Sequence, residues 1–286
     1  MDRCTYGMVD AKMQVLQMLG QWISNPTSVG GSIGICGPPG TGKTQFVRDG
    51  LSKSIGREFS FVSLGGASDA SIITGNSYTY EGSAWGRVIQ ILMDSRTMNP
   101  VIYFDELDKV SDTPRGQEII NALIHLTDTT QNSQFRDRYF SDIDFDLSRC
   151  LFVFSYNDET KISPVLLDRM NRVYVKGYSC SDKKTIARAH LLPTVRSQFG
   201  FSDGDVIIPD SVLDHLATSP RFTQSEEGVR NLKRSLESIH SRLNLARLIN
   251  AEGVGSAFPY EVTLADVAKF VPTESSAEAS VLAMYV

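Results

Sequence analysis

The chain has 286 residues and a mass of 31.6 kDa, enough to bury a full hydrophobic core and to form two domains. Its hydrophobic fraction of 41% and charged fraction of 21% are ordinary for a globular protein, and no apolar run approaches the length of a membrane span. A net charge of −5, without any run rich in Lys and Arg, argues against a nucleic-acid motor.

The cysteines and histidines give no sign of a metal site or a disulfide framework. Cys4, Cys36, Cys150 and Cys180 are far apart and form no C-x-x-C pair, and the four histidines are equally scattered. We expect free thiols, which fit a cytoplasmic or other reducing intracellular compartment. The first residues lack the apolar segment of a signal peptide.

Short apolar runs alternate with helical patterns through the first 176 residues. The helical stretches between them include Gly86–Arg96 and Gly116–Leu126. Alternation of this kind predicts an α/β domain, residues 1–176, with a parallel sheet covered by helices on both faces. The predicted strands are Ile33–Cys36, Phe59–Leu64, Val101–Phe104, Leu151–Phe154 and Val173–Val175.

The pattern becomes helical from Gly177 onward. Helices are predicted over Ser181–Leu192, Asp210–Ala217 and Glu226–Ile249, the last with an apolar stripe at spacings of three and four residues. Residues 177–272 are therefore expected to form a small helical domain, and residues 273–286 a flexible polar tail.

The most specific motif follows the first predicted strand and precedes a helix. It matches the phosphate-loop pattern G-x-x-x-x-G-K-[ST] in full: Gly37, Pro38, Pro39, Gly40, Thr41, Gly42, Lys43 and Thr44. Its glycines let backbone N–H groups surround a polyphosphate, and the following helix N-terminus favours negative charge. Lys43 would reach the β- and γ-phosphates, and the Thr44 hydroxyl would ligate Mg²⁺. This motif predicts binding of ATP or GTP.

Two carboxylates end the strand over residues 101–104. Asp105 would hold Mg²⁺, and Glu106 would orient and activate the attacking water. A solvated acidic strand end is the alternative, but a phosphate loop upstream makes the hydrolytic interpretation the stronger one. The Glu after the Asp favours a hydrolase over a nucleotide switch.

Three further polar residues fit a nucleotide site less specifically. Asn157 follows a strand and could contact the γ-phosphate, although an Asn there is more often a turn residue. Arg169 ends a short helix and could reach a neighbouring subunit's nucleotide or pair with Asp168 on the surface. Arg230 lies near the start of the long helix predicted in the second domain and could reach over the nucleotide.

Taken in order, these motifs resemble a AAA+ ATPase, and most closely the ATPase module of Lon-type proteases. The resemblance covers nearly the whole chain. Besides the phosphate loop, the similar segments are Tyr6-Gly7, Leu64-Gly65-Gly66, Thr79–Ser83, Phe104–Lys109, Asp137–Phe140, Asp146–Ser148, Leu166–Met170, Gly177-Tyr178, His190–Pro193 and Glu227–Arg230.

The resemblance implies a AAA+ P-loop three-layer sandwich followed by a small helical lid, with ATP and Mg²⁺ as cofactors. By matching position, Asn157 corresponds to sensor 1, Arg169 to an arginine finger acting in trans, and Arg230 to sensor 2. Tyr6 and Gly7 correspond to the adenine-contacting segment. Because the finger comes from a neighbour, a homo-hexameric ring is implied.

Tyr80 matches the aromatic residue of the pore loop that grips an extended polypeptide. An aromatic side chain suits that task because it packs on a backbone of any sequence. A half-buried structural tyrosine is the alternative. Glu81 departs from the family, which has an aliphatic residue there, so the grip of the loop could be altered.

The leading functional hypothesis is therefore a Mg²⁺-dependent ATPase that unfolds, translocates or remodels protein substrates, with a separate peptidase as a candidate partner. No Ser–Lys peptidase signature is found, so no peptidase activity is expected from this chain alone. The alternatives are a nucleotide-switched AAA+ adaptor with slow turnover and, disfavoured by the acidic balance, a nucleic-acid remodeller. Neither a membrane nor nucleic acid is an expected partner.

Overall fold

A computed structural model describes residues 1, 4–25, 30–67, 69–79, 81–249 and 259–271. By its internal contacts the chain separates into two compact units, and each is described here by itself. The first consists of Met1–Gly37 and Gly42–Lys176, and the second begins at Gly177. The second unit also includes Pro38–Thr41, the middle of the phosphate loop, which the predicted boundaries assign to the first domain.

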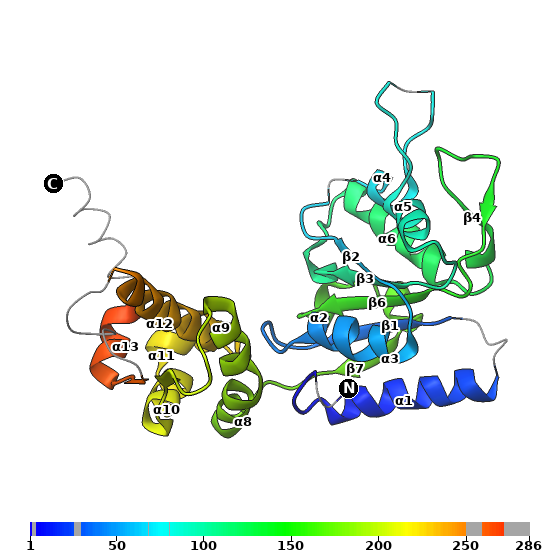
Figure 1. Cartoon of the computed structure of the whole chain (residues 1–286). Coiled ribbons are helices and arrows are strands. Elements are labelled where there is room, and N and C mark those ends of the chain that lie inside the picture. Colours follow the sequence, from blue (N-terminus) through cyan, green and yellow to red (C-terminus); the bar gives the residue numbers. More distant parts are fainter. Residues whose placement is uncertain (2–3, 26–29, 68, 80, 250–258, 272–286) are drawn as a thin grey trace. The chain divides into compact units, whose positions relative to one another are not determined.

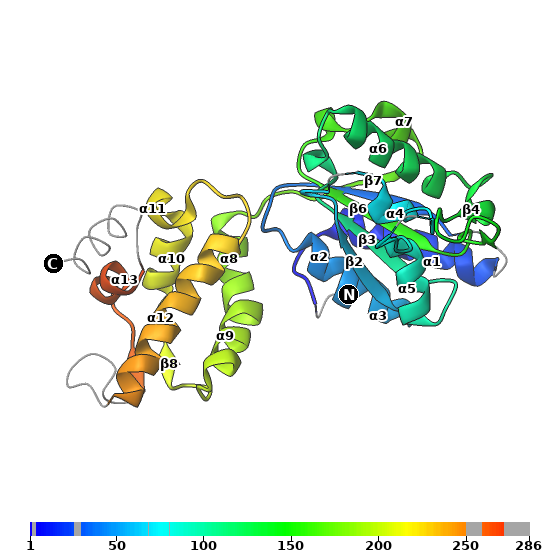
Figure 2. The same cartoon turned by 90° about the horizontal axis from the view of Figure 1, so that it is seen from above.

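The first unit is built on a five-stranded parallel sheet, which confirms the predicted α/β class. The strand order is β2-β3-β6-β1-β7 (Figures 1 and 2). The strands are β1 Ser32–Cys36, β2 Phe59–Ser63, β3 Val101–Asp105, β6 Leu151–Tyr156 and β7 Asn171–Tyr174. The three central strands, β3, β6 and β1, are buried over most of their length, as expected when helices cover both faces of a parallel sheet.

Two apolar cores lie on opposite faces of this sheet. On one face, Val101 and Tyr103 of β3 pack with helix α1 and with the helix that follows the phosphate loop. On the other face, Ile102 and Phe104 pack with α4, α5, α6 and α7. Figure 1 shows α1–α3 and α4–α6 on the two sides of the sheet. The helix bounds are α1 Val9–Ser24, α4 Ser71–Thr74, α5 Arg87–Ser95, α6 Pro114–Thr127 and α7 Pro164–Asp168.

The helix after the phosphate loop is continuous but not uniform. It begins as α2, Lys43–Gln45, widens into a π-helical stretch over Phe46–Ser52, and ends as α3, Lys53–Ile55. Gly56, in the left-handed conformation, ends it. Phe46, Val47 and Leu51 bury this helix against the sheet, which fixes the position of Lys43 and Thr44 at its first turn.

Asp137 ties two loops of the first unit together. Its fully buried carboxylate accepts hydrogen bonds from Gly86 N at the start of α5 and from Tyr139 N, both at 2.8 Å. Trp85 packs on Tyr139 and Phe140, with ring centroids 5.6 and 6.1 Å apart. This anchors the base of the loop over 75–86 beside the small hairpin of β4, Phe135–Arg136, and β5, Asp144–Phe145. Short 3-10 turns at Leu107–Lys109, Asn132–Gln134 and Glu159–Lys161 complete the unit.

The second unit is mainly helical, with one core around the long helix α12. Its helices are α8 Cys180–Ile186, continued by a π-helical stretch over Ala187–Leu191, α9 Leu192–Phe199, α10 Asp210–Thr218, α11 Pro220–Thr223, α12 Arg230–Leu248 and α13 Leu264–Phe270. The sequence analysis missed a short parallel pair, β8 Val206–Ile207 with β9 Tyr260–Glu261. It also started the long helix at Glu226, whereas α12 begins at Arg230.

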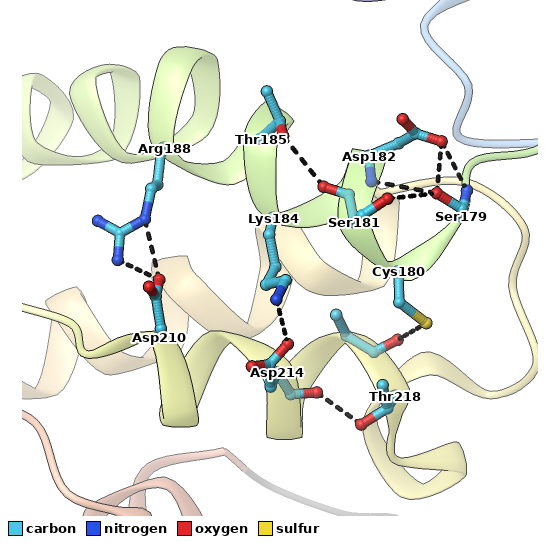
Figure 3. Close-up of polar contacts among 11 residues, drawn as sticks. Ser179, Cys180, Ser181, Asp182, Lys184, Thr185, Arg188, Asp210, Asp214 and Thr218 are labelled. Carbon is cyan, nitrogen blue, oxygen red and sulfur yellow. Dashed lines mark hydrogen bonds and ion pairs between the residues drawn. The ribbon is translucent and has the colours of Figure 1, made fainter.

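Helices α8 and α10 are joined by polar contacts (Figure 3). Lys184 Nζ lies 2.7 Å from Asp214 Oδ1, and Arg188 Nε donates to Asp210 Oδ1 at 3.1 Å. A capping box starts α8, in which the Ser179 and Asp182 side chains each accept from the other's backbone N–H. The side chains that make these contacts are largely exposed, so the contacts add little to the free energy of unfolding. Their main effect is to determine how α8 and α10 pair.

His240 on α12 makes the second unit sensitive to acid. The ring is fully buried and its Nδ1 lies 2.8 Å from Leu236 O, whereas Nε2 has no hydrogen-bond partner among the described residues. Burial therefore lowers the His240 pKa below its ordinary value, and Arg196 lowers it further. The unfolded state then binds more protons than the folded state as pH falls through about 6.5.

We predict that the second unit loses stability between pH 7.5 and pH 5.5, and that His240→Leu removes much of this dependence. The measurement is the urea midpoint followed by circular dichroism at both pH values. His125→Gln, at an exposed histidine of the first unit, serves as the control. An equal acid-induced drop in wild type and His240→Leu would show that another group is responsible.

Candidate nucleotide site

The phosphate loop connects the end of β1 to the start of α2. Gly40 and Gly42 have φ values of 76° and 89°, in the left-handed region that favours glycine. Gly37 lies so close to Val175 that a Cβ there would collide with the Val175 carbonyl. The Thr41 hydroxyl donates to Pro38 O at 2.9 Å and holds the loop in its curve. The glycines of the motif are thus required by backbone shape and close packing.

Lys43 is the buried cation of the site, with only 9% of its surface exposed. Its Nζ donates to Gly37 O and, at 2.7 Å, to Asn157 Oδ1. Burial lowers the Lys43 pKa, while Asp105, Cys36 and Asp108 oppose that shift. A buried ammonium held by neutral oxygens gains from an added anion, so the environment of Lys43 suits a phosphate group.

Asn157 follows β6, the strand between β1 and β3. Because these three strands are parallel, their carboxyl ends meet at one edge of the sheet. The structure therefore brings Lys43 and Asn157 together, as the hydrogen bond between them shows. It also places Asp105, the last residue of β3, at the same edge.

Asp105 belongs to a network of hydroxyl groups that includes Thr44. Ser155 Oγ donates to Asp105 Oδ1, and Thr44 Oγ1 lies 3.1 Å from Tyr103 Oη. Thr44 and Asp105 supply a hydroxyl and a carboxylate oxygen, the hard donors that Mg²⁺ takes together with substrate phosphates. The residues present therefore fit a nucleotide-bound Mg²⁺.

Glu106 has an unusual backbone conformation directly after β3. Its φ of 60° lies in the left-handed region, which non-glycine residues adopt at a cost of about 1–3 kcal/mol. Strain of this kind persists where the surrounding structure dictates it, as at catalytic sites. The bend directs the chain into the 3-10 turn Leu107–Lys109.

Gly65 contacts Glu106, and the sequence analysis assigned it no role. A Cβ at Gly65 would collide with Glu106 Oε2. Leu64 N donates to Asp105 O at 3.0 Å, which is the last backbone hydrogen bond between the β2 and β3 segments. Gly65 is the next residue along the chain. The Gly65-Gly66 pair after a predicted strand was the available signal, but only the structure identifies the glutamate as the neighbour.

Asp108 is a second residue near the site whose role could not be predicted from the sequence. It is only 5% exposed, and neither carboxylate oxygen has a hydrogen-bond partner among the described residues. Lys109 Nζ lies 3.7 Å away, too far for a hydrogen bond. The carboxylate raises the pKa of both Lys43 and Cys36, so its negative charge acts on the site and helps to keep Lys43 charged.

The N-terminal segment containing Tyr6 and Gly7 reaches the phosphate-loop helix. Gly7 and Met8 are both left-handed, with φ values of 65° and 52°, and this turn starts α1. A Cβ on Gly42 would lie 3.9 Å from Met8 Cε. The segment that the family resemblance relates to adenine binding therefore lies beside the loop that would hold the phosphates.

Arg169 is engaged elsewhere in the first unit. The arginine directly follows α7, and its Nη1 lies 2.7 Å from Asp128 Oδ2, not on Asp168 as the surface-pair alternative had it. The Asp128 pKa falls to about 2, mainly through hydrogen bonds from Thr130 and then through Arg169. The Arg169 side chain is 32% exposed. In a single chain, then, the structure does not bring Arg169 to Lys43.

Arg230 lies in the second unit, which also contains Pro38–Thr41 of the phosphate loop. There, Val229 N donates to Gly40 O at 3.0 Å, and Tyr178 Oη donates to Thr41 O at 2.8 Å. A Cβ on Gly40 would lie 3.0 Å from Arg230 Cβ, and a Cβ on Gly228 would collide with Pro39 O. The first residue of α12 thus lies beside the middle of the phosphate loop. Tyr80 falls outside the described residues.

With this geometry established, the chain can be compared with known proteins. Residues 33–178 match the family described as "ATPase family associated with various cellular activities (AAA)". The chain belongs to this AAA family, which confirms the P-loop fold and the resemblance noted in the sequence.

Its relatives include Lon proteases. The chain is 39% identical to a Lon protease homolog of Acanthamoeba polyphaga mimivirus over 86% of its length, and 37% identical to a mitochondrial Lon protease homolog of Schizosaccharomyces pombe over 86%. It is 37% identical to a Lon protease of Desulfovibrio desulfuricans over 94%. The matched part covers 24%, 22% and 29% of those three proteins, so the chain corresponds to a Lon-like AAA module.

Within the described ranges, no helix is long and apolar enough to cross a lipid bilayer. The same residues contain no cluster of three or more His, Cys, Asp or Glu side chains that could hold a metal ion unaided. The four cysteines are free thiols.

We predict that Gly65→Ala slows ATP hydrolysis by displacing Glu106 while leaving nucleotide affinity within about twofold. The new methyl group collides with the Glu106 carboxylate but not with Lys43, and misplacing a general base costs up to about 10²–10⁴ in rate. Steady-state hydrolysis and binding of a fluorescent ATP analogue measure the two effects.

Gly20→Ala on α1 is the matched control, since a Cβ there meets nothing within 4 Å. Gly65→Ala hydrolysing ATP at the wild-type rate would mean that the position of Glu106 does not limit turnover.

Proposed function

We propose that this chain is a Mg²⁺-dependent ATPase motor whose turnover drives unfolding, translocation or remodelling of protein substrates. The observation that carries the proposal is the contact of Lys43 with Asn157 at the sheet edge where Asp105 and Glu106 end the neighbouring strand. Membership of the AAA family supports ATP as the nucleotide, and similarity to Lon proteases supports polypeptides as the substrate.

Each residue has a distinct part in the proposed reaction. Thr44 and Asp105 would hold Mg²⁺ together with the nucleotide, and the metal would supply positive charge to the β- and γ-phosphates. Lys43 contacts the same phosphates, and Asn157, already hydrogen-bonded to Lys43, holds that ammonium in place and faces the γ-phosphate. Glu106 accepts a proton from the attacking water. Arg230, at the start of α12 and beside Gly40, serves as the sensor of the second unit, residues 177–272.

A homo-hexameric ring is the proposed assembly, because Arg169, the candidate arginine finger, pairs within its own chain and would act on the nucleotide of a neighbouring subunit. Arg169 pairs with Asp128 of its own chain and is about one-third exposed, so it can exchange this partner for the γ-phosphate of a neighbouring subunit's nucleotide. Tyr6 and Gly7 are proposed to contact adenine. Tyr80 is proposed to contact the polypeptide, on a loop whose base is fixed by Asp137.

A nucleotide-switched adaptor with slow turnover is the second candidate, and Glu81 beside Tyr80 is the observation that favours it. A carboxylate in this loop is costly to bury against an apolar stretch of a substrate polypeptide. The loop would therefore bind substrate weakly. A separate peptidase acting on the unfolded product is compatible with either candidate. The free cysteines fit a reducing intracellular location.

ATP hydrolysis measured alone, with a casein-like unfolded protein and with DNA separates the candidates. We predict stimulation by unfolded protein and not by DNA. Lys43→Ala should abolish nucleotide binding, whereas Glu106→Gln should bind ATP and hydrolyse it about 10²–10⁴ times more slowly. A slow rate that responds to neither addition would support the adaptor, and stimulation by DNA alone would exclude the protein motor.

Arg169→Ala is predicted to leave ATP affinity nearly unchanged and to reduce turnover by about 10³ or more, as fingers supplied in trans do elsewhere. Because the defect lies between subunits, mixing Arg169→Ala with Lys43→Ala chains should restore activity where an intact pocket meets an intact finger. Asp128→Asn, which removes the charge of the resting partner, is the matched control and should retain turnover. Mixed rings as inactive as both parents would contradict a role in trans.

A further inference from the structure

Tyr103 places a buried hydroxyl group beside Thr44, one of the residues of the candidate Mg²⁺ site. It lies on β3 two residues before Asp105, so both side chains project from the same face of the strand. The residue is completely buried, and its ring packs on Phe59 and Phe61 with centroids 5.8 and 5.9 Å away. An apolar residue would fill this position without burying a polar group, so the hydroxyl calls for an explanation.

The partners of this hydroxyl are the residues proposed to hold Mg²⁺. Tyr103 Oη lies 3.1 Å from Thr44 Oγ1 and also interacts with the Ser155 and Asp105 side chains. Ser155 Oγ in turn donates to Asp105 Oδ1. One buried phenol therefore links the first turn of the phosphate-loop helix to the end of β3.

Tyr156 on β6 provides an internal comparison. It is equally buried, at 1% exposed, yet its hydroxyl has no hydrogen-bond partner among the described residues. Burial alone therefore does not supply partners for a tyrosine in this sheet. The contacts of Tyr103 arise from its position beneath Thr44 and Asp105.

We propose that Tyr103 is a positioning residue for the metal site, acting through Thr44 and Asp105. A hydroxyl that gives a lone pair to Mg²⁺ must direct its hydrogen elsewhere, and Tyr103 Oη, 3.1 Å from Thr44 Oγ1, can accept that hydrogen. The Tyr103 O–H then donates to Asp105, which leaves the other lone pairs of that carboxylate facing the cation. This inference rests on the proposed Mg²⁺–ATP site.

Hydrogen bonds made to metal ligands by the residues behind them fix the orientation of those ligands, and their loss typically lowers metal affinity about 10–100-fold. Tyr103 does not contact the nucleotide in this account. Its loss should therefore weaken binding of the metal far more than binding of the metal-free nucleotide.

The test compares wild type with Tyr103→Phe, which removes one oxygen and keeps the ring. Binding of a fluorescent, slowly hydrolysed ATP analogue is titrated against free Mg²⁺ and repeated in EDTA. We expect the half-saturating Mg²⁺ concentration to rise about tenfold or more, with affinity in EDTA unchanged. Tyr156→Phe is the matched control and should leave both values as in wild type.

A double-mutant cycle shows whether the effect passes through Thr44. In a Thr44→Ala background, Tyr103→Phe should have a much smaller effect on Mg²⁺ dependence than in wild type. Should Tyr103→Phe fail to fold by circular dichroism, Tyr103→Leu tests the same hydroxyl with a shorter apolar side chain.

A wild-type Mg²⁺ midpoint in the folded variant, or equal losses with and without Mg²⁺, would overturn the positioning role. Failure of the proposed function is a distinct result, because wild-type protein itself would then bind no ATP analogue or bind it without regard to Mg²⁺.

Discussion

The parallel pairing of β6 with β1 on one side and β3 on the other determines what this protein can do. In this register the phosphate loop, Asn157 and Asp105 all leave the sheet at the same edge. The apolar cores on the two faces hold the three strands in that register, because a slip by one residue would turn buried side chains of β3 toward the wrong face. The geometry of the site is thus a consequence of how the sheet is packed.

The charges at this edge favour binding of a polyphosphate with a divalent cation. Lys43 is buried among neutral oxygens, while Asp105 and the buried carboxylate of Asp108 bring negative charge close to it. An added anion offsets the cost of the buried ammonium, and an added Mg²⁺ offsets the cost of the carboxylates. A Mg²⁺–nucleotide complex supplies both charges together, which neither ion does alone.

Local patterns were sufficient to predict the fold and to identify most of the candidate site residues. The five central strands are apolar runs bounded by loops, and the phosphate loop is a contiguous motif, so each could be read from neighbouring residues. The AAA family match supports the same fold. The start of α12 was misplaced because Gly228 packs against Pro39, a contact nearly 190 residues away in sequence that no local pattern reveals.

The contacts that could not be predicted from the sequence all join residues that are distant along the chain. In the sequence Gly65 was only part of a segment similar to Lon, and its contact with Glu106 is known from the structure alone. Tyr103 was only one position of a predicted apolar strand. The pairing of Arg169 with Asp128, in place of Asp168, likewise depends on how α7 packs near the end of α6. Tertiary packing, and not local propensity, decides each of these cases.

The central claim is that Thr44 and Asp105 hold a cation against phosphates bound by Lys43. A crystal grown with a non-hydrolysable ATP analogue and Mn²⁺ in place of Mg²⁺ tests it directly, because Mn²⁺ can be located by its anomalous scattering. We expect a single strong Mn²⁺ peak beside the β- and γ-phosphates, within coordination distance of Thr44 Oγ1 and linked to Asp105 directly or through water. A nucleotide bound away from Lys43, or a Mn²⁺ peak distant from both Thr44 and Asp105, would contradict it.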